Sequence, residues 1–128
     1  DVLGIERLDH GFSVMEDPQL VDRLAERRFA FTVCPNDNVR INTDRFATIA
    51  DHPVAAMRDA GLLVTLNTDD PAMIDLDLTE ELALTAEALG WTWDDLVALS
   101  LDAADAAWLD DGERGEVKQR IRLGAAAA

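Results

Sequence analysis

The strongest constraint on the fold is an alternation of apolar and helical segments in the first half of the chain. Apolar residues dominate residues 3–8, 29–34 and 62–66, the last two reading Phe-Ala-Phe-Thr-Val-Cys and Leu-Leu-Val-Thr-Leu. Helical patterns separate them at residues 18–27 and 53–60. A strand that is apolar throughout is typical of a parallel sheet covered on both faces. The order therefore predicts an α/β fold in which crossover helices join parallel strands.

Local signals mark the ends of the two crossover helices. Asp17 and Pro18 form a favourable N-cap and first-turn pair for the first helix. Gly61 suits the position that follows the second helix, whose start we expect Asp51 or His52 to cap. Each helix thus ends shortly before the next expected strand.

Only helices are expected after the third strand. An amphipathic segment covers residues 78–89, and a last helix is expected over residues 111–123. Between them, Thr92 and Asp95 are spaced as in a capping box, which predicts a helix that runs to about Ala107.

We expect a single domain over residues 1–124. The low-complexity residues 125–128 are expected to form a disordered tail. Residues 35–51 show no clear periodicity and are expected to form a long loop, which in compact domains is often functional.

The composition excludes several classes of partner. The 128 residues include 11 Lys and Arg against 26 Asp and Glu, a net charge of −15. Nucleic-acid binding and polybasic membrane anchoring both need a basic surface, and no apolar run approaches the ~20 residues of a membrane span. We therefore expect no nucleic acid and no membrane. The single cysteine, Cys34, excludes a disulfide framework within the chain, and a cytoplasmic location is expected.

Polar residues gather directly after each of the three expected strands. They are Asp9 and His10, then residues 35–38, then residues 67–70. The carboxyl ends of parallel strands meet at one edge of the sheet, where α/β folds bind their ligands. The sequence therefore predicts one active-site rim built from these three segments.

Two adjacent carboxylates, Asp69 and Asp70, are the sharpest candidates for chemistry. Such a pair suits a divalent cation or general-base catalysis, but Asn-Thr-Asp-Asp-Pro is also favourable turn chemistry, so both interpretations stay open. His10 is either an acid, base or charge stabiliser near neutral pH or a partly buried structural histidine. We interpret His52 as a helix cap and Cys34 as a small, buried residue at a strand end.

Four motifs, taken in order, resemble the adenosine/adenine deaminase family. The resemblance covers nearly the whole chain and implies the C-terminal part of a (β/α)₈ TIM barrel, with about its last three strands and the terminal helices. It also implies one catalytic Zn²⁺ and hydrolytic removal of a purine 6-amino group as ammonia. The first choice of substrate is adenosine, which would give inosine, and the second is adenine, which would give hypoxanthine. The motifs are Glu6-Arg7-Leu8-Asp9-His10-Gly11, Thr32-Val33-Cys34-Pro35 with Asn38, His52-Pro53, and Leu66-Asn67-Thr68-Asp69-Asp70-Pro71.

The resemblance implies roles for three residues. Asp69 would be a metal ligand and a catalytic residue that accepts a hydrogen bond from the metal-bound water. His10 would be the second catalytic residue, which orients that water and stabilises charge as it attacks. Asp70 would bind the substrate at the N7 edge of the purine. Zinc lowers the pKa of bound water toward ~7, which is consistent with these roles.

The chain also departs from the family pattern. The family takes further zinc ligands from a His-x-His motif and from a His-Ala-x-Glu motif that also carries the proton-donating Glu, whereas this sequence has only His10 and His52. A catalytic zinc needs about three protein ligands. We therefore expect the isolated chain to be inactive, and to need the N-terminal half of the barrel as well as a small purine substrate. Asn36-Asp37-Asn38 also stands where the family usually has a Ser.

Two other interpretations remain. The chain would be a non-catalytic α/β interaction module or subunit, or it would belong to another amidohydrolase-type zinc hydrolase that acts on a different ring. His10 and Asp69 fit the latter equally well. An upstream sequence or partner chain that carries the two missing motifs would favour the enzyme over the module.

Overall fold

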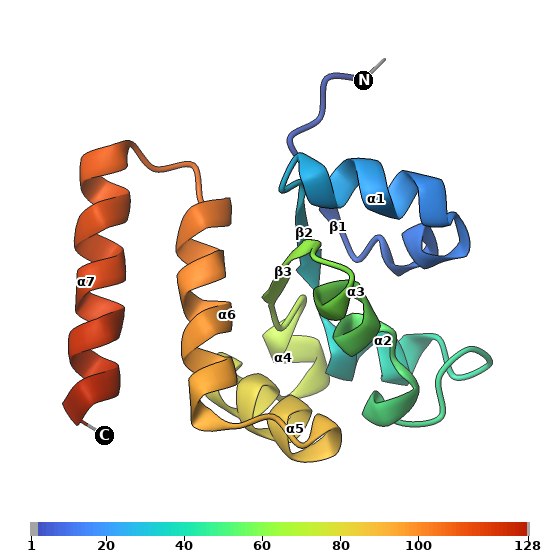
Figure 1. Cartoon of the computed structure of the whole chain (residues 1–128). Helices are drawn as coiled ribbons and strands as arrows, with labels where there is room; N and C mark the ends of the chain where they lie inside the picture. Colours follow the sequence, from blue (N-terminus) through green and yellow to red (C-terminus); the bar gives the residue numbers. More distant parts are fainter. Residues whose placement is uncertain (1–2, 128) are drawn as a thin grey trace.

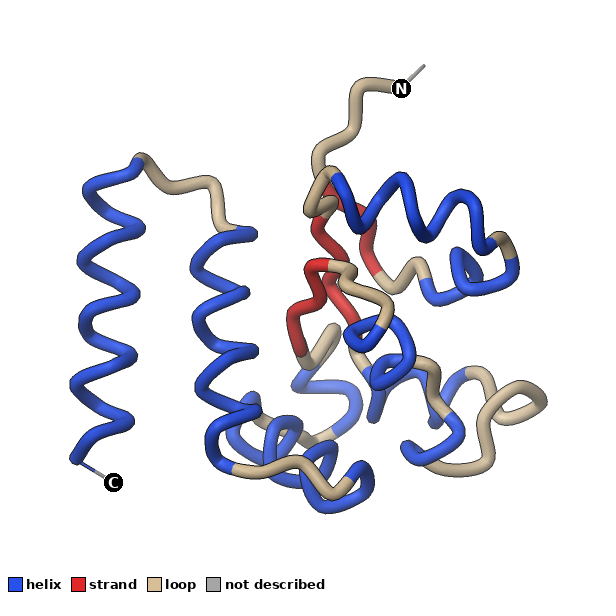
Figure 2. The backbone as a smooth tube through the Cα atoms, viewed as in Figure 1, coloured by secondary structure: helices blue, strands red, loops and turns tan. Residues whose placement is uncertain are grey.

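The computed structural model describes residues 3–127 and contains one three-stranded sheet. All neighbouring strands are parallel, and each strand lies beside the one that precedes it in sequence, so that the spatial order is β1-β2-β3 (Figure 2). This confirms the predicted α/β fold and brings the three carboxyl ends to one edge. The strands are β1 (Arg7–Asp9), β2 (Ala30–Val33) and β3 (Leu63–Leu66).

Helical segments join the strands, as the alternation predicts. The Asp17 side chain caps α1 by accepting a hydrogen bond from the Leu20 N–H at 3.0 Å. The His52 ring accepts a hydrogen bond from the Val54 N–H at 3.1 Å, so His52 satisfies the first N–H of α3, although the N-cap residue itself is Pro53. The connecting segments are η1 (Phe12–Glu16) and α1 (Pro18–Glu26), then α2 (Pro35–Ile41), η2 (Ile49–Asp51) and α3 (Val54–Asp59).

Four helices follow the sheet: α4 (Pro71–Ile74), α5 (Leu78–Leu89), α6 (Trp93–Ala106) and α7 (Asp111–Ala127). Figure 1 shows α6 on one side of β3 and α3 on the other, with α7 outside α6. The predicted capping box of Thr92 and Asp95 is present at the start of α6. Among the described residues, no helix combines the length and apolar character needed to cross a membrane.

The core fills the space between the strands and the helices beside them. Every residue of β3 is buried, as the apolar run predicts for a strand covered on both faces. Phe31 and Val33 of β2 are fully enclosed, and they pack with Val54 and Met57 of α3 and with Leu99 of α6. The sheet edge that carries the polar residues is therefore held by a packed interior.

Two sequence predictions are wrong in detail. Residues 35–51 are not one long loop, because α2 begins at Pro35, and proline is well suited to the first turn of a helix. The predicted disordered tail is also wrong for residues 125–127, which continue α7, because alanine has the highest intrinsic helix propensity. Residue 128 lies outside the described residues.

Candidate functional site

Three segments meet at the carboxyl edge of the sheet, as predicted. His10 follows β1 directly, Cys34 follows β2, and Asp69 lies shortly after β3. An open pocket is present between them. Its lining residues are Asp9, His10, Thr32, Cys34, Asn67, Thr68 and Asp69.

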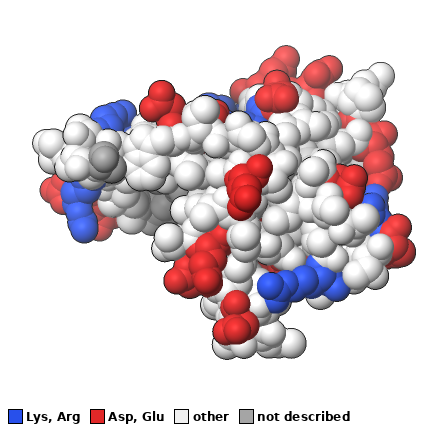
Figure 3. Space-filling model, turned by 90° about the horizontal axis from the view of Figure 1, so that it is seen from below, with Lys and Arg blue, Asp and Glu red and all other residues white. Residues whose placement is uncertain are grey.

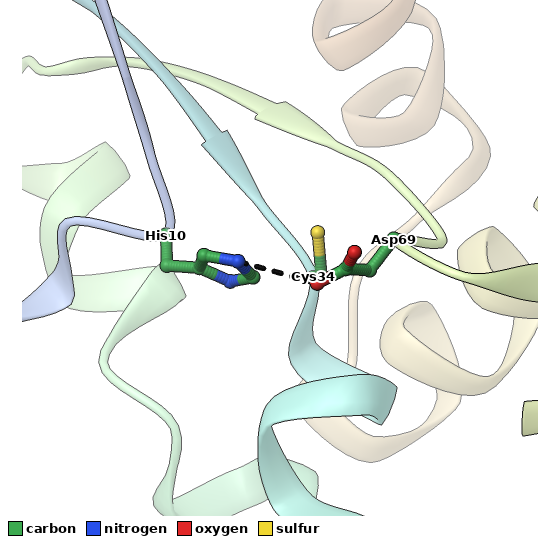
Figure 4. A group of neighbouring side chains, drawn as sticks. All are labelled: His10, Cys34 and Asp69. Carbon is green, nitrogen blue, oxygen red and sulfur yellow. Dashed lines mark ion pairs between the residues drawn. The ribbon is translucent and has the colours of Figure 1, made fainter. Parts of the chain in front are cut away.

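The pocket brings His10 and Asp69 into direct contact. The distance between His10 Nε2 and Asp69 Oδ2 is 3.2 Å, and both side chains are partly exposed (Figure 4). One potential ligand atom from each of His10, Cys34 and Asp69 lies within 4.8 Å of the other two. Asp70, by contrast, is exposed at the N-cap of α4 and is not part of the pocket lining.

The backbone at both contact residues is left-handed. His10 has a φ of 57° and Asp69 a φ of 60°, although neither is a glycine. Such conformations cost of order 1–3 kcal/mol and tend to occur at functional sites, where the surrounding fold holds them. The next residue, Gly11, has a φ of 61°, and a Cβ placed there would lie 2.7 Å from Cδ1 of Phe31. The turn after β1 therefore needs glycine, and it directs the His10 ring toward Asp69.

A second group of side chains supports His10 from behind. Asn38 of α2 is 1% exposed, and its Nδ2 lies 3.0 Å from His10 Nδ1. The Oδ1 of the same amide lies 3.2 Å from Nε2 of His52. His52 is buried, and burial lowers its pKa to about 4, with the charge of His10 as a smaller cause. Asn38 thus connects a pocket residue to a buried helix cap.

Buried acids surround the other side of the pocket. Glu81 of α5 is 0% exposed, and burial raises its pKa. Burial and the charge of Asp69 raise the pKa of Asp37. Burial, followed by the charges of Asp69, Glu81 and Asp37, raises the pKa of Cys34 to about 12, so its thiol stays protonated. This confirms Cys34 as a buried residue at a strand end.

These groups fit a cation in part. Asp37 Oδ2 and Glu81 Oε2 are buried without a hydrogen-bond partner among the described residues, so ionisation of either acid would place an uncompensated negative charge behind Asp69. A positive ion held by Asp69 would offset it. His10 already uses both ring nitrogens within the chain. Asp69 is therefore the ligand that the described residues offer most directly, and a catalytic zinc would take its other ligands from elsewhere.

Comparison with known families decides the relationship. The family model for adenosine deaminase matches residues 1–123. The chain belongs to the adenosine deaminase family. It corresponds to a partial, C-terminal region of that family, as the four motifs predict.

Curated members of the adenosine deaminase family agree with this assignment. The chain is 45% identical over 113 residues to an adenine deaminase of Streptomyces coelicolor, which covers 88% of the chain and 33% of the relative. It is 34% identical over 119 residues to an adenosine deaminase of Salmonella heidelberg, which covers 93% of the chain and 35% of the relative. The chain therefore spans about a third of the length of the curated relatives it matches.

Solved structures in the family share the fold. The adenine deaminase of Arthrobacter aurescens superposes with a TM-score of 0.92 at 29% identity, over 98% of this chain and 38% of that one. A zinc-bound amidohydrolase of Burkholderia ambifaria superposes with a TM-score of 0.81 at 31% identity, over 100% of this chain and 37% of that one. These neighbours are TIM-barrel amidohydrolases, and the chain corresponds to about a third of such a barrel.

Sequence reasoning missed two features of the site. Asn38 lies in the motif that contains Cys34, but sequence reasoning assigned it no role. Its contacts with His10 and His52 form only in the folded chain. The same reasoning also missed the buried Glu81. The signal was available, since Leu82, Ala86 and Leu89 recur at helical spacing on the buried face of α5, and Glu81 lies beside them, one turn before Thr85.

Proposed function

We propose that the chain carries part of the active site of a zinc-dependent hydrolase that removes the 6-amino group of adenine or adenosine as ammonia. The observation that carries the proposal is the 3.2 Å contact between His10 Nε2 and Asp69 Oδ2 at the carboxyl edge of parallel strands. Membership of the adenosine deaminase family and the zinc-bound structural relative support it.

In this proposal Asp69 would hold the zinc ion and would accept a hydrogen bond from the attacking water. Zinc bound there would supply Lewis acidity and favour ionisation of that water near neutral pH. His10 would orient the water and stabilise the negative charge that develops during attack. Asp70, at the start of α4, binds the N7 edge of the purine.

Adenine is the first substrate to test. The 45% identical relative from Streptomyces coelicolor is named an adenine deaminase, whereas the adenosine deaminase of Salmonella heidelberg is 34% identical. A panel of adenine, adenosine and unrelated amino-substituted rings, tested by ammonia release, decides the substrate class. Turnover of another ring without turnover of either purine would favour another amidohydrolase-type zinc hydrolase.

The rest of the barrel is part of the proposal. The described residues offer one carboxylate for the metal, and a catalytic zinc needs about three protein ligands. We infer that the N-terminal part of the barrel supplies the others, and that the isolated chain is inactive. Adding that part to the chain is then expected to restore ammonia release.

The decisive experiment is Asp69→Asn in the full-length protein. We expect bound zinc to fall and kcat/KM to drop by at least about 100-fold, because the amide lacks the charge that holds the ion. The matched control is Asp59→Asn, which makes the same change at an exposed position at the end of α3. The control is expected to keep both zinc and activity. Full zinc content and activity in the Asp69 variant would refute the assigned role.

A further inference from the structure

Three hydrogen bonds and one ion-pair contact run in series from the backbone of α3 to the pocket. The Val54 N–H donates to His52 Nδ1 at 3.1 Å, and His52 Nε2 lies 3.2 Å from Asn38 Oδ1. Asn38 Nδ2 lies 3.0 Å from His10 Nδ1, and His10 Nε2 lies 3.2 Å from Asp69 Oδ2. The last of these contacts is the dashed line of Figure 4.

The first bond fixes the direction of all the others. A backbone N–H can only donate, so His52 Nδ1 must accept and the proton of the neutral His52 ring lies on Nε2. That N–H donates to the Asn38 carbonyl oxygen, which leaves the Asn38 amide nitrogen to face His10. His10 Nδ1 is then an acceptor, and the proton of a neutral His10 lies on Nε2, toward Asp69.

The reversed chain is unfavourable. If the Asn38 amide were turned over, His52 would have to accept at Nε2 and carry its proton on Nδ1, which faces the Val54 N–H. Two donors would then meet at a site where His52 is 3% exposed. A buried donor without a partner costs about 1–3 kcal/mol. Burial also lowers the pKa of His52 to about 4, so the ring stays neutral near pH 7.

We propose that Asn38 and His52 are positioning residues that lock His10 in the tautomer with its proton on Nε2. His10 therefore faces the reaction centre as a hydrogen-bond donor. The catalytic part of this inference rests on the proposed function, whereas the tautomer is a property of the fold.

The locked tautomer restricts what His10 can do. A ring that presents N–H toward Asp69 can hold the oxygen of an attacking water and stabilise negative charge on it. It has no lone pair there with which to remove a proton, because the acceptor nitrogen is occupied by Asn38. Proton removal from the water then falls to a carboxylate.

The tautomer can be read directly by ¹⁵N NMR of the histidine-labelled, zinc-loaded, full-length protein. His10 and His52 signals are assigned by their loss in His10→Gln and His52→Gln. We expect both rings to show a protonated Nε2 and an unprotonated Nδ1 at pH 7. A His10 ring with its proton on Nδ1, or an even mixture of tautomers, would overturn the inference.

Asn38→Asp tests the cause. The carboxylate presents only acceptors, so we expect His10 to move its proton to Nδ1 or to take up a second one, while kcat falls about 10- to 100-fold and KM changes little. Asn42→Asp is the control, because it makes the same change at the C-cap of α2, where the side chain is outside the series of contacts from Val54 to Asp69. Unchanged His10 signals in Asn38→Asp would contradict the proposed role.

His52 gives a second test with a conservative rescue. His52→Leu removes both the acceptor for Val54 and the donor to Asn38, and we expect a mixture of His10 tautomers with a loss of kcat. His52→Gln keeps an amide donor for Asn38 and is expected to retain the Nε2 tautomer and most of kcat. Circular dichroism checks that both variants fold. Equal loss in both variants would show a structural role only.

The two proposals fail separately. A locked Nε2 tautomer in a protein that deaminates neither purine would refute the proposed function and leave the positioning role of Asn38 and His52 intact. Purine deamination by a protein in which His10 shows a mixture of tautomers would support the proposed function and refute the positioning role of Asn38 and His52.

Discussion

At the scale of single residues, the fold rather than the side chain decides which groups around the pocket carry charge. Burial favours the neutral form of His52, which as a base has a lowered pKa, and of Glu81, which as an acid has a raised one. The neutral His52 is what allows Asn38 to hold His10 in one direction. The neutral form of His52 therefore helps to determine how the His10 ring is oriented in the pocket.

His52 should make the stability of the protein depend on pH in a defined window. Its pKa is about 4 in the folded chain against an ordinary value of 6.5. Between these values the unfolded chain binds the proton and the folded chain does not. The stabilising contribution is thus complete above pH 6.5 and is lost as the pH falls toward 4, by roughly 3 kcal/mol in total.

Comparison with His52→Gln isolates this effect, because glutamine does not titrate. The difference in free energy of unfolding between wild type and variant, from urea unfolding at several pH values, is expected to shrink as the pH falls from 6.5 to 4. A constant difference across that window would show that His52 is not neutral in the folded protein.

At the scale of elements, prediction from sequence succeeded where local signals and tertiary contacts agree. Helix α5 was expected over residues 78–89 and is found there, because its apolar period and Gly90 point to the same ends. Helix α2 was missed, because Pro-Asn-Asp-Asn has the composition of a turn. The helix forms as buried contacts outweigh that preference, with the Asn36 N–H bonded to Glu81 and Asn38 bonded to His10.

In the candidate site, too, the residues with a local sequence signal were predicted and those placed by tertiary contacts were not. His10 and Asp69 were predicted because each follows an apolar strand, and parallel strands bring their carboxyl ends together. The supporting residues come from distant parts of the sequence: Asn38 from α2, Glu81 from α5, and His52 from the segment before α3. No local pattern specifies those distances.

The turn after β1 offers a test at this scale. Gly11→Ala would place a Cβ 2.7 Å from Cδ1 of Phe31, a residue enclosed in the core, and would keep a φ of 61°. We expect a loss of about 2–4 kcal/mol in the free energy of unfolding, from the clash and the left-handed backbone together. Gly90→Ala shares the positive φ but meets no atom within 4 Å, and is expected to lose only about 1 kcal/mol. Equal losses in urea unfolding would mean that Phe31 can move aside.

At the scale of the whole molecule, the described chain leaves pairing surface exposed. β1 and β3 each pair with β2 alone among the described residues, so each has one side free. Beside β1, Leu3 is 83% exposed and Ile5 is 52% exposed, and they line a shallow apolar pocket. Open strand edges and apolar patches favour association. The net charge of −15 opposes it, and acidic groups outnumber basic ones on the face shown in Figure 3.

We therefore expect the isolated 128-residue chain to associate, and to do so more strongly at high salt, where the repulsion between acidic surfaces is screened. Sedimentation velocity at low and high salt measures this. Ile5→Lys places a charge in the exposed apolar patch and is expected to reduce association at both salt concentrations. A monomer that melts cooperatively at either salt concentration would contradict the prediction.

The left-handed backbone at His10 and Asp69 has a consequence for protein engineering. Glycine and asparagine adopt this conformation at lower cost than histidine or aspartate do. A directed-evolution campaign that selects for thermostability alone would therefore enrich Gly or Asn at positions 10 and 69, and would remove the contact on which the proposed chemistry depends. Libraries built on this fold should hold both codons constant and draw their gains in stability from positions away from the sheet edge.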